Sequence, residues 1–328
     1  MKRVSIKDVA KEAGVSITTV SHSLSGRGVI KQETRDRVIE IAKRMNYIPD
    51  WNGRNLKAVA TRTIGLFTKS IRGYYGQLAD AMSEECKVHG YELDIFVTDD
   101  EQMMLSSLIS HRVDGAVILH SGLTDQSVEM LIRAEVPVLF LDREIQGKTV
   151  SSVLFDSYAT GQMAAKYLHQ LGHRRILFVE GQDTYDGIMR RRGFMEYMKT
   201  IGEPIPEEYQ IDGWFDRGVA NKAMKEFLSK GLPLPDAIFA TNDDSAFGCI
   251  KALLGAGYKV PEDVSVMGVD DIELSRWYAP SLTTIRTHID QQGQRAAKEV
   301  IRLVNGHSGT SIRIQGDIVE RKSCRQKS

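Results

Sequence analysis

The hydrophobic pattern of the chain changes its period near residue 63, and this change limits the folds open to it. From there on, short continuous apolar runs alternate with amphipathic stretches of helical spacing. Apolar strands between helices are typical of parallel sheets covered on both faces. The pattern extends over about 260 residues, more than one typical open sheet needs, so the sequence predicts an α/β body of two doubly wound parallel-sheet lobes. The predicted strands are 64–67, 93–97, 116–119, 136–141, 153–155, 176–179, 237–240 and 264–269.

Before residue 60 the pattern is helical. Residues 6–13 place apolar side chains at helical spacing, Ser5 and Asp8 have the spacing of a capping box, and Gly14 ends this helix. A second helix is expected after Ser16, and a third after the following glycine loop. Two helices that are joined by a tight glycine turn and supported by a third helix form the helix-turn-helix motif. A generic three-helix mini-domain remains the alternative at this point.

The charge of the chain is unevenly distributed. Over all 328 residues, 43 Lys and Arg balance 43 Asp and Glu, but residues 1–60 carry a net charge of +6 and the remainder −6. A basic head on an acidic body suggests that the head meets a polyanion while the body has another task.

Between the head and the body the pattern weakens. Pro49 breaks the third helix, and residues 51–57 could form two helical turns with little apolar surface. A helix this short is not stable alone in water. We therefore expect a helix-turn-helix domain at 1–46, a hinge at 47–60 and a two-lobed core at 61–328.

The sequence lacks the common catalytic motifs. It has no phosphate-binding loop of the form GxxxxGK[ST], no HExxH and no nucleophile elbow on a strand. Its eight histidines show no metal-ligand spacing, and its three cysteines form no CxxC pair. We expect no enzyme, no metal and no cofactor. The polar start and the absence of a long apolar run predict a cytoplasmic protein without a membrane span.

Several ordered motifs resemble the lactose-repressor/galactose-repressor family of bacterial transcription regulators. The head carries VSIKDVAKEAGVS at 4–16, TVS at 19–21 and NYIP at 46–49. The body carries VDG at 113–115, PV at 137–138, DR at 142–143, LGHRRI at 171–176, Arg190 with GF at 193–194, TND at 241–243, GVDD at 268–271 and LTTI at 282–285. Each body motif alone is weak, but the ordered set is specific. The resemblance covers residues 4 to about 322 and implies a periplasmic-binding-protein-like core.

For the head, the resemblance implies that the second helix enters the DNA major groove. Ile17, Thr18 and His22 would then face base edges, while Ser16, Thr19 and Ser21 could reach phosphates. Many members have Arg at the position of His22. A neutral imidazole offers one donor and one acceptor, so the preferred operator is expected to differ from the family's commonest one, unless His22 contacts only the backbone.

For the linker, the resemblance implies a hinge helix that forms on DNA and lies in the minor groove beside that of a second copy. Leu56 stands at the position of the leucine that wedges between base pairs. Gly53 stands where the family often has Ala, which adds up to about 1 kcal/mol to the free energy of ordering this helix.

For the core, the resemblance implies a small-molecule effector held between the lobes. The matching positions are Tyr74, Asp142, Arg190, Trp214, Asn242 and Asp270. Most of them also follow predicted strands, where open sheets bind ligands. Carboxylates, a guanidinium, an amide and flat aromatic rings suit a neutral polyhydroxylated ligand, although Arg190 could hold a phosphate. The structural alternatives are that Asp142 and Asp270 cap turns and that Trp214 belongs to the core.

The resulting hypothesis is a sequence-specific DNA-binding repressor of a carbohydrate-utilisation operon. It would bind operator DNA as a homodimer, and a sugar or sugar phosphate in the core would control its affinity. Without a C-terminal leucine heptad, no coiled-coil tetramer is expected. One alternative is a global catabolite regulator controlled by a phosphoprotein corepressor, and more remote ones are a transport binding protein and a metabolic enzyme of similar architecture.

Overall fold

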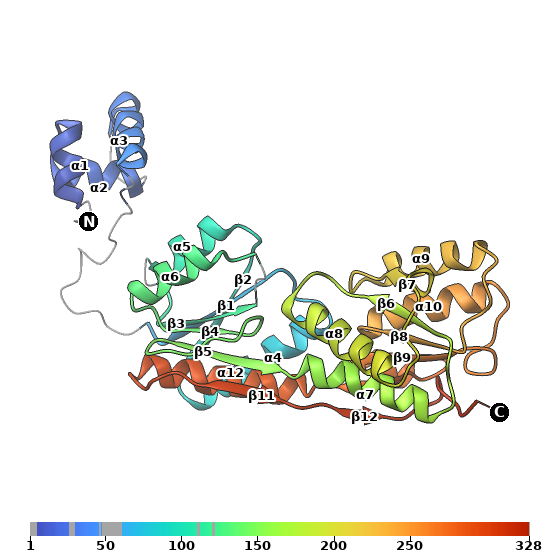
Figure 1. Cartoon of the computed structure of the whole chain (residues 1–328). Helices are drawn as coiled ribbons and strands as arrows, with labels where there is room; N and C mark the ends of the chain where they lie inside the picture. The colour runs from blue at the N-terminus through green and yellow to red at the C-terminus, as the bar shows by residue number, and fades with distance from the viewer. Residues whose placement is uncertain are drawn as a thin grey trace. The chain divides into compact units, whose positions relative to one another are not determined.

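The computed structural model describes residues 5–25, 30–45, 47, 61–109, 112–119 and 122–327. The chain forms two compact units, one of residues 1–61 with 100–113 and one of residues 62–99 with 114–328 (Figure 1). None of the helices in the described ranges is long and apolar enough to cross a membrane.

The head contains three helices, α1 (Ile6–Ala13), α2 (Ile17–Ser25) and α3 (Gln32–Arg44). The predicted capping box is confirmed, because the amide of Asp8 donates to Ser5 Oγ and the amide of Ser5 donates to the Asp8 carboxylate. Gly14 follows α1 at φ 64°, a conformation that glycine adopts without strain. Val9, Val20 and Val38, one from each helix, are fully buried in one small apolar core. The first unit also includes α5 (Glu101–Ile109).

The second unit contains two six-stranded sheets. The first has the strand order β11-β5-β4-β3-β1-β2, and the second β12-β10-β9-β8-β6-β7. The first sheet consists of β1 (Thr63–Thr68), β2 (Glu92–Val97), β3 (Gly115–Leu119), β4 (Val138–Phe140), β5 (Val150–Phe155) and β11 (Ser311–Ile314). The second consists of β6 (Ile176–Glu180), β7 (Gln210–Asp212), β8 (Ala237–Ala240), β9 (Ser265–Asp270), β10 (Thr283–Arg286) and β12 (Asp317–Val319).

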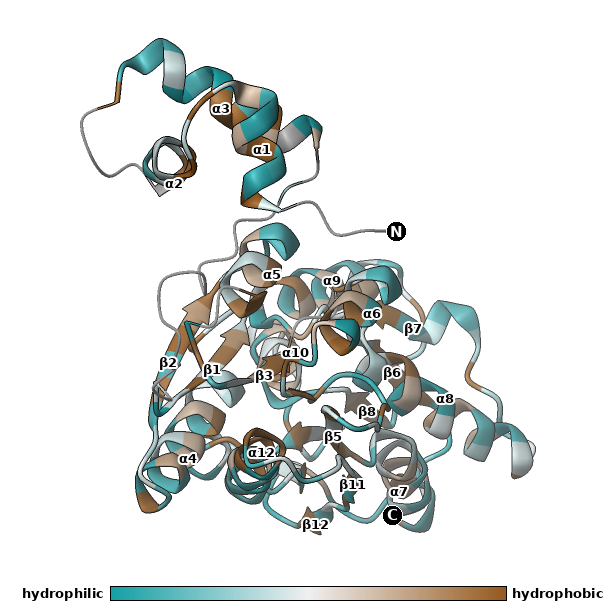
Figure 2. Ribbon diagram, turned by 90° about the vertical axis from the view of Figure 1, so that its left-hand side faces the viewer, coloured by the Kyte–Doolittle hydropathy of each residue, from teal (hydrophilic) through white to brown (hydrophobic). Residues whose placement is uncertain are grey.

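Every strand pair is parallel except β10 with β12, which is an antiparallel edge. Central strands such as β4, β5 and β8 are buried along their whole length, as parallel strands covered on both faces must be. Figure 2 shows hydrophobic residues concentrated in the strands and hydrophilic ones on the outer faces of the helices. The α/β fold class with two doubly wound lobes is therefore confirmed.

Helices cover the sheets. The longer ones of this unit are α4 (Tyr74–Val88), α6 (Asp125–Arg133), α7 (Ser157–Gln170), α8 (Tyr185–Thr200), α9 (Arg217–Ser229), α10 (Asp243–Gly255) and α12 (Ile289–Val304). Two short helices are η2 (Glu207–Tyr209) and α11 (Leu274–Trp277). Helix α12 packs on α4 and β5 of the first lobe, whereas α7 packs on α8 and α10 on α9 in the second. The chain passes between the lobes after β5, after β10 and after β11.

Four strands have no counterpart in the sequence prediction. They are β7, β10, β11 and β12, each of three or four residues. Strands this short leave too few alternating positions for a period to be recognised. β11 and β12 are also edge strands, so their side chains are only partly buried.

Candidate functional site

Helix α2 presents an exposed polar face on the head. Ser16 precedes it, as predicted, and accepts a 3.1 Å hydrogen bond from the amide of Thr19, so it caps the helix. Val20 points into the core of the head, whereas Ile17 is 44% exposed and Thr18 is also exposed. An exposed large apolar side chain beside a hydroxyl leaves this face free to contact another molecule.

The other head residues differ in how far the structure describes them. Ser21 and His22 lie half-buried on α2. Leu56 and residues 48–60 of the predicted hinge 47–60 lie outside the described residues, whereas Tyr47 is buried in the core of the head.

The second unit holds a cavity of about 540 Å³. Its walls are loops at the carboxyl ends of strands from both sheets, including the loop after β1 and the ends of β4, β8 and β9. This is where open parallel sheets bind ligands. Tyr74, Asp142, Arg190, Asn242 and Asp270 all line it, so the structure brings five of the six predicted effector positions together.

Asp142 is the most unusual of these residues. It directly follows the β4 region and is only 9% exposed, yet neither carboxylate oxygen has a hydrogen-bond partner in the described part of the chain. It therefore caps no turn. Burial raises the pKa of this carboxyl to about 6, while the charge of Arg143 opposes the rise. A buried carboxylate without donors is costly unless a ligand supplies them.

Arg190 enters the cavity from α8 and is 4% exposed. Its guanidinium donates to the carbonyl oxygen of Thr241 and, over 3.3 Å, to Ser157 Oγ. Its Nε has no partner among the residues that the structure describes. The group thus retains hydrogen-bonding capacity for a ligand.

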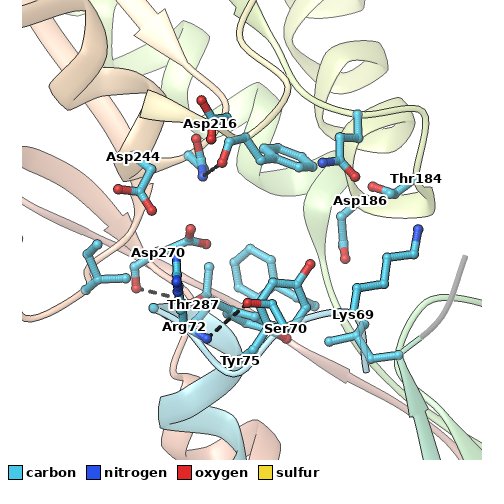
Figure 3. Close-up of a pocket in the computed structure, with 18 of the residues that line it drawn as sticks. Lys69, Ser70, Arg72, Tyr75, Thr184, Asp186, Asp216, Asp244, Asp270 and Thr287 are labelled. Carbon is cyan, nitrogen blue, oxygen red and sulfur yellow. Dashed lines mark hydrogen bonds between the residues drawn. The ribbon is translucent and has the colours of Figure 1, made fainter. Parts of the chain in front are cut away.

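Tyr74 and Asp270 approach the cavity from different lobes. Tyr74 opens α4 and donates a 2.6 Å hydrogen bond to Gln292 Oε1 of α12, which fixes its ring. Asp270 ends β9 at φ 121°, a conformation that non-glycine residues rarely adopt. Its carbonyl accepts from Thr287 (Figure 3), and burial raises the pKa of its carboxyl well above the usual range. The carboxyl itself makes no hydrogen bond to a described residue, so Asp270 does not cap a turn.

Asn242 has a structural task as well. Its Oδ1 accepts from the amide of Ser245 at 2.9 Å and caps α10, and its Nδ2 donates to the Phe215 carbonyl at 3.3 Å. One amide hydrogen remains for a ligand.

The sixth position, Trp214, does not line the cavity. Its side chain is 52% exposed, neither core nor cavity wall, and the next residue, Phe215, provides the aromatic surface. Both residues have positive φ, 53° and 55°, a conformation that residues other than glycine rarely adopt. The prediction therefore missed the aromatic residue of the cavity wall by one position.

Other lining residues were not predicted. They are Lys69, Ser70, Arg72, Gly73, Tyr75, Leu119, Phe155, Gln182, Thr184, Asp186, Phe215, Asp216, Arg217, Asp244, Ile272 and Thr287. Asp186 stands out because it lies in the first turn of α8, just beyond the end of β6. The rule that located Asn242 and Asp270, polar side chains after a strand, also applies to Asp186. Among the described residues, no cluster could hold a metal ion.

Comparison with known proteins gives matches along nearly the whole chain. The family described as "Bacterial regulatory proteins, lacI family" matches residues 5–50, and "Periplasmic binding proteins and sugar binding domain of LacI family" matches residues 61–322. The probable HTH-type transcriptional repressor ExuR of Bacillus subtilis (strain 168) is 31% identical over 307 residues, 92% of each chain. The HTH-type transcriptional repressor PurR of Pasteurella multocida (strain Pm70) is 33% identical over 331 residues, 98% of this chain and 99% of that one.

Solved structures agree. The complex of the transcriptional regulator CelR with cellobiose has a TM-score of 0.74 at 25% identity, and covers 98% of this chain and 100% of that one. The Lac repressor dimer bound to operator and the anti-inducer ONPF has a TM-score of 0.73 at 26% identity, and covers 99% and 100%.

Proposed function

The chain belongs to the LacI family of bacterial regulatory proteins, and from this premise we propose that it represses a carbohydrate-utilisation operon under the control of a sugar or sugar phosphate. As a member of this family it is a DNA-binding transcriptional repressor with a sugar-binding domain, and not an enzyme.

One observation carries the proposal. Asp142 is buried at the wall of a cavity that also contains Arg190 and Asp270, and its two carboxylate oxygens lack donors in the described structure. Adjacent hydroxyl groups on a small ring would supply these donors, and the guanidinium would receive a hydroxyl or phosphate oxygen. The rings of Tyr74 and Phe215 offer flat apolar surface for the ring face of such a ligand. The related CelR structure holds a sugar, cellobiose.

The expected division of the chain into a head, a hinge and a core would allow the following mechanism. Two copies would place two α2 helices on a roughly palindromic operator, because one short helix on a +6 head provides little specificity. The related Lac repressor is seen as a dimer on its operator. A ligand that binds the two lobes in one relative orientation better than in another shifts that orientation, and the hinge at 47–60 passes the change to the heads.

A phosphoprotein corepressor is less well supported as the source of the signal. A corepressor protein would bind to the surface of the regulator. It would not require buried ionic side chains with unpaired hydrogen-bonding atoms in a cavity. The cavity chemistry therefore favours a small molecule.

A thermal-shift panel tests the proposal. Purified full-length protein is screened against sugars and sugar phosphates, then again in the presence of an operator selected from a random duplex pool. We expect at least one compound to raise the melting temperature and to change operator affinity. If no sugar or sugar phosphate does either, or if only a phosphoprotein alters operator affinity, the proposal is wrong.

A further inference from the structure

The groups that face the cavity are unbalanced in charge. Five aspartates line it, of which Asp216 caps α9 and Asp244 is paired with Arg217. The remaining three carboxyl groups, those of Asp142, Asp186 and Asp270, face one buried guanidinium, that of Arg190. No ion pair joins Arg190 to any of them in the described structure; its hydrogen bonds go to Thr241 and Ser157. Without the paired and capping groups, the cavity wall thus carries more carboxyl groups than cations.

The other cations lie at the rim. Lys69, Arg72 and Arg217 are exposed, and Arg217 is paired with Asp244 at 2.5 Å. Figure 3 shows Lys69 and Arg72 on different sides of the cavity, so they do not form one anion-binding pair. Water screens exposed charges, whereas the inner carboxyls act in a less polar medium.

Asp186 is the member of this group that comes from α8. Its Oδ1 accepts a 2.5 Å hydrogen bond from Ser157 Oγ, and its other oxygen has no partner among the described residues. Figure 3 shows its carboxylate facing the cavity. Its charge raises the pKa of Asp142 from the other lobe, and also that of Asp270. Burial raises the pKa of two half-buried tyrosines, Tyr74 and Tyr75, and the charge of Asp186 adds to the rise.

Helix stability explains the position of Asp186 only in part. An acid in the first turn of α8 is favoured by the helix dipole, and Thr184 caps the same helix. An exposed acidic residue at this position would have the same favourable interaction with the helix dipole without the free-energy cost of removing its carboxylate from water. Burial instead raises the pKa of Asp186, and Arg190 and Ser157 offset only part of the rise.

We propose that Asp186 sets the charge selectivity of the cavity, so that it prefers a polyhydroxylated ligand with a protonated amino group to one with a phosphate or carboxylate. An ammonium group provides three donors and a positive charge for the carboxyl oxygens of both lobes. A neutral sugar supplies donors without the charge, and an anion adds repulsion. This inference rests on the proposed sugar-sensing function and narrows it.

The first test compares matched ligands. Glucosamine, galactosamine and mannosamine are titrated beside their parent sugars, 6-phosphates and uronic acids, by calorimetry at pH 7. We expect the amine of at least one series to bind the native protein about tenfold or more tightly than its phosphate. In Asp186→Asn this preference should shrink to about threefold or less, because the amide keeps the Ser157 hydrogen bond without the charge. Asp183→Asn, an exposed acid in the preceding loop, is the matched control and should change nothing.

Tighter binding of a phosphate or uronate to the native protein would overturn the assignment. So would an amine-to-phosphate affinity ratio in Asp186→Asn equal to that of the native protein. Asp186→Ser serves if the amide variant does not fold.

The second test needs no ligand. When folding raises the pKa of a carboxyl group, the folded state is more stable at low pH than at high pH. This stability is lost as the pH rises from about 4, the pKa in the unfolded chain, through the raised pKa of the folded state. Asp186→Asn should therefore melt at a higher temperature than the native protein at pH 8, with a smaller difference at pH 4.5. An equal difference at both pH values contradicts the electrostatic role. If no compound of the panel binds, the sugar-sensing function fails and the selectivity of Asp186 fails with it. If compounds bind without the expected charge preference, only the selectivity fails.

Discussion

The side-chain oxygens of Ser16 and Thr19 lie 2.9 Å apart at the start of α2, where the Thr19 amide also donates to Ser16 Oγ. Both hydroxyls were expected to reach DNA phosphates, yet they already bond to each other. Ser16 therefore acts first as a helix cap, and its removal affects the helix that is to enter the groove.

Replacing Ser16 by Ala should lower the stability of the head by about 1 kcal/mol and weaken binding to all duplexes alike. Ser16→Asp separates the two roles. Aspartate keeps the cap and suits the helix dipole, but it repels phosphate. We expect thermal unfolding of the head to be near native in this variant and DNA affinity to fall strongly. Near-native affinity in Ser16→Asp would show that Ser16 does not approach the backbone.

His22→Ala should change which sequences the protein prefers. A base contact through the imidazole favours particular base pairs, and its loss costs about 1–3 kcal/mol at those positions. Selection from a random duplex pool, for the native and variant proteins, measures the change. An equal loss of affinity on every sequence would mean that His22 contacts only the backbone.

Leu56→Ala should weaken operator binding by about tenfold or more while ligand affinity stays native. The expectation follows from the proposed wedge, which lets bent DNA contact more of the protein. Fluorescence anisotropy gives the operator affinity, and calorimetry with the ligand provides the control. Unchanged operator affinity would remove the hinge from the mechanism.

Asp142→Asn should stabilise the core at neutral pH. The pKa of Asp142 is raised to about 6, so the folded state loses stability as pH rises from about 4 to 6, by up to about 3 kcal/mol. The Asn variant does not lose stability in this way. Between pH 4 and pH 8, its melting temperature should therefore rise above that of the native protein once the pH exceeds 5. The same variant should bind the ligand less tightly, because the amide offers one acceptor in place of two. Parallel pH profiles of the native and variant proteins would contradict the assigned burial cost.

Much of the fold could be predicted because its signals are local. Strands such as β1 and β8 are mostly apolar runs, and the capping box at Ser5 lies within four residues, Ser5 to Asp8. Helix α8 gave a weaker signal, because its buried face includes Arg190, Gly187 and Gly193 rather than a row of apolar side chains. A Cβ on Gly193 would come within 2.0 Å of the Tyr158 carbonyl oxygen, so close packing against α7 takes the place of hydrophobic periodicity there.

The cavity was only partly predictable. Residues directly after strands, such as Asp142 and Asp270, follow from the geometry of parallel sheets. Phe215, and not Trp214, lines the cavity, and both residues have positive φ, which no side-chain pattern predicts. The excess of carboxyl groups over cations, to which Asp186 and Arg190 belong, likewise could be recognised only from the burial and hydrogen-bond partners of these residues.

The most direct measurement is the operator affinity of the full chain, with and without saturating ligand from the sugar panel, at physiological salt. The account predicts a change of about 5- to 150-fold, the usual range for allosteric coupling. Asp270→Asn should bind the operator as the native protein does and lose this response. If ligand occupancy is demonstrated by calorimetry and operator affinity still does not move, the cavity does not control DNA binding and the central claim is contradicted.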